Sequence, residues 1–276
     1  MRNRRWTCLW PWALLCLCGV LSVSVGGFGQ SDSALPAEFA AMRPALCDKP
    51  ADFIDTGCNV CPAFMFENAE HTSNSGLGVN SVLFGSFTSL NKTEAFLSSV
   101  GCFDHAEGYA SAFLLRKEQG SWRRLSFFHK DGPLGICSKI VGQGDMRDSL
   151  LCNYEDYGAG GFRAIAFDAS GKVKTESVLV QTWAYPGFRS EEKQKHCSTV
   201  DAQIKNVSFG SIEISIFMNS FDVDPPINCF NESEDTSSTI SNSRKVESTA
   251  IFIRNDDSFA PDEKTKKLLA EIAKSR

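Results

Sequence analysis

The sequence predicts a mainly β protein built from about three four-stranded antiparallel units, with a short helix at each end. From residue 58 to residue 259, short apolar runs alternate with Gly, Asn, Asp and Ser, which is the pattern of antiparallel strands and turns. The same pattern recurs along this stretch, and only the flanking segments show helical periodicity. Such units can assemble as a partial propeller or as a twisted β-sandwich.

Residues 1–29 have the three-part plan of a secretory signal peptide. Basic residues at the extreme N-terminus precede an apolar run over residues 6–25, and small residues follow it. We expect cleavage near residues 27–30 and a secreted or periplasmic protein, with an uncleaved N-terminal anchor as the alternative. No later stretch is long enough to form a membrane-spanning helix, so we expect no span after signal removal.

The charge balance is acidic. The chain has 28 Lys and Arg residues against 33 Asp and Glu residues, a formal net charge of −5. Loss of residues 1–27 removes three arginines and no acidic residue, which leaves 25 basic against 33 acidic residues and a formal charge of −8. No basic block remains for a phosphate backbone, so nucleic acid is not an expected partner.

Residues 30–57 are expected to form an N-terminal helical segment that packs on the β domain as a lid or brace. Pro44 interrupts the helix. The apolar residues with helical spacing are Leu35, Phe39, Met42 and Leu46.

The β-repeat domain, residues 58–259, divides into units at about residues 78–130, 135–183 and 203–254. Residues 93–97 match residues 147–151 at an offset of 54, and later pairs of segments match at offsets of 53 and 51. The third unit is weaker and is interrupted by a polar stretch over residues 231–243, which we expect to be a mobile loop.

Residues 260–276 are expected to form a C-terminal helix resting on the sheet. Acidic residues come first and basic residues later, which suits the helix dipole. Leu268, Leu269 and Ile272 fall on one side.

A resemblance to a known repeat is carried by a Phe-Gly element before an acidic strand. Phe84-Gly85-Ser86-Phe87 precedes residues 94–97, and Gly144-Asp145 precedes residues 148–151. Over residues 78–253 this resembles the FG-GAP repeat, the blade of integrin alpha-chain propellers and of many secreted bacterial proteins. The resemblance implies propeller blades. That family usually carries calcium ligands after the Phe-Gly element, but residues 88–93 read Thr-Ser-Leu-Asn-Lys-Thr, so a calcium site is not supported.

Eight cysteines remain after signal removal, and an even set in an exported chain predicts disulfides. Cys137 and Cys152 flank a turn at Gly144-Asp145, which would place them opposite each other across a hairpin. Cys197–Cys229 is the next expected pair. The other four are expected to pair among themselves: Cys47, Cys58, Cys61 and Cys102.

Zinc is the alternative for part of this set. Cys58 and Cys61 form a C-x-x-C element and Cys102 and His105 a C-x-x-H element, which together would offer a tetrahedral set of ligands. The same cysteines complete the disulfide set, so we expect no metal and no cofactor.

Aromatic residues in Gly-containing turns are the candidate ligand contacts: Tyr154, Tyr157, Trp183 and Tyr185. Their rings could stack on sugars or peptide side chains. The alternative, which we favour, is that they fill the centre of the sheet. Loops at residues 104–108, 153–161 and 185–191 would form the contact edge of repeated units.

Catalytic motifs are absent from the sequence: it has no G-x-S-x-G, no H-E-x-x-H and no phosphate-binding loop. We therefore expect a non-catalytic binding or interaction module for an extracellular or envelope ligand. The alternative is a secreted hydrolase that acts on glycans through loop carboxylates. The candidate carboxylates are Asp104, Glu107, Glu155 and Asp156.

Overall fold

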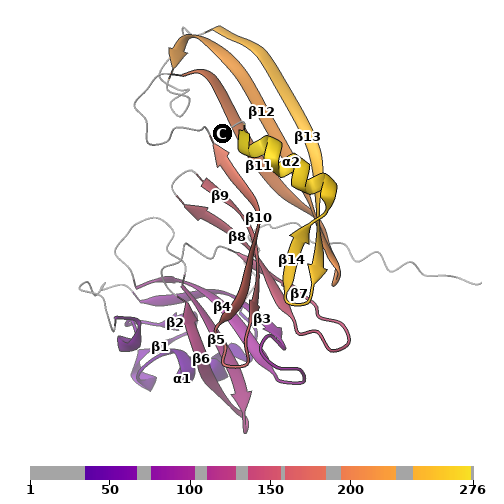
Figure 1. The fold of residues 1–276 in the computed structure, drawn as a ribbon. Helices are drawn as coiled ribbons and strands as arrows, with labels where there is room; N and C mark the ends of the chain where they lie inside the picture. The colour runs from indigo at the N-terminus through magenta and orange to yellow at the C-terminus, as the bar shows by residue number, and fades with distance from the viewer. Residues whose placement is uncertain are drawn as a thin grey trace, which may run out of the picture.

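The computed structural model contains two antiparallel sheets and two short α-helices (Figure 1). It describes residues 35–66, 76–102, 111–128, 136–156, 159–184, 194–227 and 239–274. The prediction of a mainly β protein with a helix near each end is confirmed. The predicted signal peptide, residues 1–29, lies outside the described residues.

The first sheet has six strands in the sequential order β1-β2-β3-β4-β5-β6. Every neighbouring pair is antiparallel, so the sheet is a simple meander in which β6 forms one edge. The strands are β1 (Phe53–Ile54), β2 (Gly57–Cys58), β3 (Leu77–Gly85), β4 (Glu94–Gly101), β5 (Ser111–Glu118) and β6 (Ser121–Phe128).

The second sheet has eight strands in the order β14-β13-β12-β11-β10-β9-β8-β7. Pairing of β10 with β11 through Trp183 and Val200 joins β7–β10 and β11–β14 into one continuous sheet. The strands are β7 (Cys137–Ile140), β8 (Ser149–Asp156), β9 (Ala159–Phe167), β10 (Val173–Ala184), β11 (Gln194–Val207), β12 (Ser211–Ile227), β13 (Thr239–Asn255) and β14 (Ser258–Pro261).

The helices are short and lie at the two ends of the chain. Helix α1 (Phe39–Leu46) contains Pro44 near its C-terminus, and two 3₁₀ turns follow it at Pro50–Asp52 and Ala63–Phe66. Helix α2 (Glu263–Lys274) begins after Asp262, whose carboxylate accepts a hydrogen bond from the Thr265 amide at 2.7 Å. This N-cap explains why the helix begins where it does.

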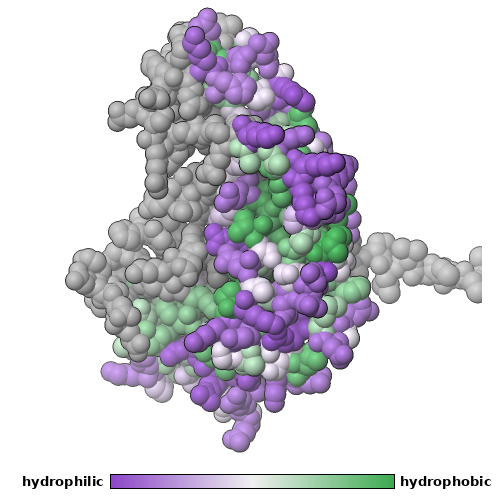
Figure 2. Space-filling view, viewed as in Figure 1, coloured by the Kyte–Doolittle hydropathy of each residue, from purple (hydrophilic) through white to green (hydrophobic). Residues whose placement is uncertain are grey.

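Three apolar layers hold the elements together. Residues of α1 and the following turns cover one face of the first sheet, around Met42, Leu97 and Phe113. The other face of that sheet packs on β8 and β9 through Phe96 and Phe167. The opposite face of the second sheet packs against α2 through Ile272. Beside α2 and β14, hydrophobic residues gather on a surface that is otherwise mostly polar (Figure 2).

The second sheet curls, so that the β13–β14 hairpin returns to β10. The Phe259 amide donates to Ser177 Oγ at 3.1 Å, and the Asp257 carboxylate accepts from Arg147 at 2.9 Å and from Lys174 at 2.7 Å. Burial acts to raise the pKa of Asp257, but the hydrogen bonds and positive charges of Lys174 and Arg147 outweigh it and hold that pKa below its usual value.

A buried ion pair lies where the two sheets meet. Glu94 has no exposed side-chain surface, and its carboxylate accepts hydrogen bonds from the Thr88 amide at 2.8 Å, the Thr88 hydroxyl at 2.5 Å and Arg116 Nε at 2.9 Å. Arg116 also donates to the carbonyl of Ala169, which precedes β10. The charge of Glu94 is therefore compensated by an opposite charge and by three donors.

Removal of Glu94 should destabilise the protein much more than removal of a neighbouring exposed carboxylate. Glu94→Ala leaves Arg116 without its buried partner, and we expect a loss of about 3–5 kcal/mol in the free energy of unfolding. Glu118 lies 3.9 Å from Arg116 but is 43% exposed, so Glu118→Ala should cost less than about 1 kcal/mol. Urea unfolding of both variants measures the difference, and equal losses would contradict the assigned role of Glu94.

Candidate functional site

Disulfides hold the N-terminal cap, residues 35–66, onto the first sheet. Cys47, directly after α1, bonds to Cys58 in β2 of this sheet, and Cys61 bonds to Cys102, directly after β4. The four cysteines therefore pair among themselves, as the sequence predicts. Because three of their sulfurs are the proposed zinc ligands, the alternative zinc site at Cys58, Cys61, Cys102 and His105 is wrong for this structure.

The remaining disulfides lie in the second sheet. Cys137 and Cys152 are bonded and directly opposite each other on β7 and β8, as expected, but the connection is longer than a two-residue turn. Asp148 accounts for the longer loop, because its carboxylate accepts from the Gly142 amide at 2.8 Å and the Ser86 amide at 2.9 Å. Cys197 is also disulfide-bonded, and its expected partner Cys229 lies outside the described residues.

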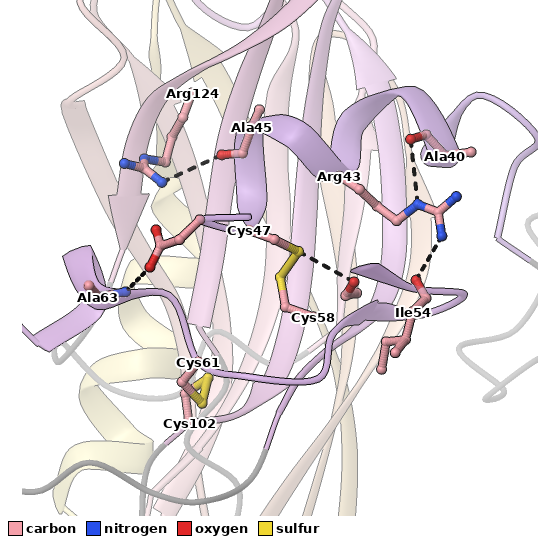
Figure 3. The surroundings of a disulfide bond; sticks show 12 residues. Ala40, Arg43, Ala45, Cys47, Ile54, Cys58, Cys61, Ala63, Cys102 and Arg124 are labelled. Carbon is pink, nitrogen blue, oxygen red and sulfur yellow. Dashed lines mark hydrogen bonds between the residues drawn. A yellow bond between two sulfur atoms is a disulfide. The ribbon is translucent and has the colours of Figure 1, made fainter. Parts of the chain in front are cut away.

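Hydrogen bonds fix the C-terminal half of α1 (Figure 3). Arg43 donates to the carbonyl of Ile54 at 3.0 Å, and Arg124 of β6 reaches the carbonyl of Ala45 at 3.5 Å. Directly after the helix, Asp48 accepts from the Ala63 amide at 2.7 Å. Polar contacts therefore join segments within the cap and connect the cap to β6, in addition to the disulfides.

An open groove of about 430 Å³ lies between the end of α1 and the edge strand β6. We call it the β6 groove. It combines a short apolar surface, two arginines and one aspartate. Its lining residues are Pro44, Ala45, Cys47, Asp48, Phe64, Trp122, Arg123 and Arg124.

The aromatic and basic side chains of the β6 groove differ in their exposure and in their contacts. The guanidinium of Arg124 stacks 3.2 Å from the centre of the Phe64 ring, which fixes its plane. Arg123 is 73% exposed, and its nearest carboxylate is that of Glu118 at 3.7 Å. Trp122 is only 7% exposed, and its buried indole N–H has no hydrogen-bond partner within the described parts of the chain.

A lysine of the neighbouring strand β5 lies beside the arginines of the β6 groove. Lys117 of β5 lies 5.8 Å from the centre of the Trp122 ring and forms a salt bridge of 2.5 Å with Glu38, just before α1. The groove therefore carries positively charged side chains at its surface, whereas the indole N–H of Trp122 is buried. Such a surface is suited to an anionic or hydrogen-bond-accepting ligand.

The aromatic ligand contacts expected from the sequence are not on an exposed edge. Tyr154 and Trp183 are each 6% exposed and lie within β8 and β10 rather than in turns. Arg163 stacks 3.9 Å from the centre of the Tyr154 ring. Strand alternation turns these rings into the packed layers, and their burial agrees with the favoured alternative that they fill the centre of the sheet. Tyr157 and Tyr185 lie outside the described residues.

The expected loops and carboxylates fall mostly outside the described residues. These include residues 104–108 and 185–191, and therefore Asp104, His105 and Glu107. Glu155 and Asp156 end β8, but the structure does not describe their side chains. In the described ranges, no group of three or more His, Cys, Asp and Glu side chains could hold a metal ion.

A second polar site joins three strands at the far end of the second sheet. His196 Nδ1 and Asp222 Oδ1 are 2.8 Å apart, and the side-chain amide of Asn242 donates to Asp222 Oδ2 at 2.7 Å. The strand register shifts immediately before His196 and Asp222, and Asn242 has φ +50°. These bulges bring the side chains of β11, β12 and β13 together.

Sequence reasoning missed the β6 groove. The signal for it was Trp122-Arg123-Arg124 directly after the Gly120 turn, an aromatic residue and two arginines in a strand of an acidic chain. The cap residues that complete the groove are distant in the sequence, and Arg124 and Ala45 are 79 residues apart.

No protein-family model matches this chain, and no curated protein matches it. Of the helices in the described residues, none is long and apolar enough to cross a membrane.

The carboxylate of Asp222 should titrate below its ordinary pKa of 3.8, because hydrogen bonds from His196 and Asn242 stabilise its charged form. This interaction stabilises the fold above the unfolded-state pKa and is lost as the pH falls through the folded-state pKa. We expect His196→Ala to raise the pKa of Asp222 and Arg244→Ala, on a neighbouring part of β13, to leave it unchanged. Carboxyl ¹³C NMR titration measures both; an unshifted Asp222 in His196→Ala would contradict the assigned cause.

Proposed function

We propose that this chain is an exported, disulfide-stabilised β-protein that binds a partner or extracellular ligand and does not catalyse a reaction. The bonded cysteines are compatible with an oxidising compartment, and the N-terminal signal pattern directs the chain there. Its FG-GAP-like repeat and the cleavage of its signal remain predictions from the sequence.

The observation that carries a binding role is the β6 groove. Its walls are fixed by the Cys47–Cys58 disulfide, by the hydrogen bond of Asp48 to the Ala63 amide and by the stacking of Arg124 on Phe64. A surface that is ordered before a ligand arrives loses little conformational entropy on binding.

The proposed export predicts where the mature N-terminus lies and that the cysteines are oxidised. We expect the protein recovered from the exported fraction of its host to begin near residue 28 and to take up alkylating agent only after reduction, at eight cysteines. Intact-mass measurement before and after reduction tests both points. Free thiols in the unreduced protein, or an N-terminus at Met1, would contradict the exported and processed form.

Binding at the β6 groove can be measured through the tryptophans. Without the signal segment the chain keeps only Trp122, in the groove, and Trp183, in the second sheet. We expect a ligand of the groove to shift the indole N–H signal of Trp122 in ¹H–¹⁵N NMR and to leave that of Trp183 in place. Trp122→Phe assigns the two signals.

The probes for this experiment are a chitin oligosaccharide and two nine-residue peptides, one of alternating Glu and Thr and one of alternating Lys and Thr. A shift of the Trp122 signal with any one of them supports the groove as a binding site. If no probe shifts it, or if all probes shift both indole signals equally, the groove is not the binding site and the proposal fails.

A further inference from the structure

We infer that the β6 groove binds an extended acidic polypeptide, which adds a strand to the free edge of β6. This inference rests on the proposed binding function and names its ligand class. The occupant is a segment of a partner protein with carboxylate side chains and a backbone in the β conformation.

Strand β6 is the edge of the first sheet. Over its eight residues it pairs with β5, and no other strand of the described residues pairs with it. One side of an edge strand presents N–H and C=O groups that no sheet neighbour satisfies. An extended peptide satisfies such groups by main-chain hydrogen bonds, which is a common mode of peptide recognition.

The groove lies against this same edge. Trp122, Arg123 and Arg124 are consecutive residues of β6, and all three line the groove. Trp122 packs with the apolar cluster under the cap, and Arg124 contacts Phe64 and Ala45 of the cap. Since successive side chains of a strand alternate, Arg123 lies on the opposite face from these two. An added strand would therefore have a basic side chain beside it on each of its faces.

The positive charges of Arg123 and Arg124 indicate that the occupant is negatively charged. The chain has a net charge of −5, so a basic site on it is a local exception to its acidic surface. Arginine binds carboxylates through paired N–H donors, and the stacking on Phe64 already fixes the plane of the Arg124 guanidinium. Asp48, which accepts a hydrogen bond from the Ala63 amide, and Glu118, which lies 3.7 Å from Arg123, offset part of this positive charge.

The same arginines argue against a second copy of this chain as the occupant. Antiparallel pairing of two β6 strands about a twofold axis would bring the Arg123 and Arg124 side chains of both copies close together, and like charges on neighbouring strands are destabilising. The bulge between Leu114 and Leu115, which leaves Leu125 unpaired in the β5–β6 register, further disfavours regular pairing of two edges.

The test uses the mature chain with its disulfides intact and the acetylated, amidated Glu-Thr peptide described above. We expect the peptide to shift the Trp122 indole signal and to slow amide hydrogen exchange along β6. The Lys-Thr peptide should bind at least about tenfold more weakly. A Glu-Thr peptide with all of its backbone amides N-methylated should also lose about tenfold, because it has no N–H to donate to strand hydrogen bonds on either edge.

A matched pair of variants separates the groove from general charge effects. Arg123→Glu should weaken binding of the Glu-Thr peptide by at least about tenfold, whereas Arg244→Glu, the same charge change on exposed β13, should not. Arg123 is exposed, so equal urea midpoints for the two variants show that folding is not the cause.

Other outcomes overturn the inference in distinguishable ways. If the chitin oligosaccharide shifts the Trp122 signal and the Glu-Thr peptide does not, the groove binds a ligand but not an acidic strand. If the N-methylated peptide binds as well as the unmodified one, the contact is through charge alone and no strand is added. If sedimentation shows a dimer with protected β6 amides in the free protein, the occupant is a second copy. If no probe shifts Trp122, the proposed function fails as well.

Discussion

The need to compensate the buried charge of Glu94 shapes the junction between the two sheets. A carboxylate without solvent access is very costly unless it is paired and hydrogen-bonded, and here Arg116 and Thr88 supply the charge and the donors. Thr88 then extends the network, because its carbonyl accepts from Arg147 at 2.8 Å, and Arg147 binds Asp257 of the β13–β14 hairpin. One chain of polar contacts thus runs from the core of the first sheet to the hairpin that closes the curl of the second.

The Glu94–Arg116 ion pair also fixes the register of β4 and β5. The two residues are direct partners on these strands, so a slip of one residue would move Glu94 to the opposite face of the sheet.

Local pattern predicted the parts of the fold that depend on neighbouring residues. The alternation of apolar and polar residues located the strands, helical spacing located α1 and α2, and the Gly144-Asp145 turn identified the Cys137–Cys152 pair. The parts that depend on distant residues were not predicted. Arg147 and Asp257 are 110 positions apart, and nothing in either segment indicates that they meet. Tyr154 and Trp183 were assigned to turns because glycines surround them, but strands β8 and β10 continue through these positions and bury the rings.

The β6 groove was not predicted either, because it too is formed by residues that are distant in the sequence. Its basic half, Trp122 to Arg124, is continuous in the sequence, but its other half comes from the end of α1 and from Phe64 in the second 3₁₀ turn. Disulfides explain why these segments stay together: the Cys47–Cys58 and Cys61–Cys102 bonds close loops on both sides of Phe64 and leave the cap few alternative positions. Cysteine counting predicted that these four cysteines would pair among themselves. It could not predict that the resulting cap would stand beside the edge of the sheet.

An edge strand next to a rigid cap faces two opposing requirements. It must avoid pairing with other copies of itself, and it must remain accessible if it is to bind a partner. The positive charge of Arg123 and Arg124 satisfies both requirements, because these side chains repel a second β6 edge and attract a strand that carries carboxylates. Covering β6 with a further strand would have prevented self-pairing equally well, and it would have removed the groove. Within the described residues, that the edge carries arginines instead of a covering strand is therefore the feature that most directly favours a binding role over a purely structural one.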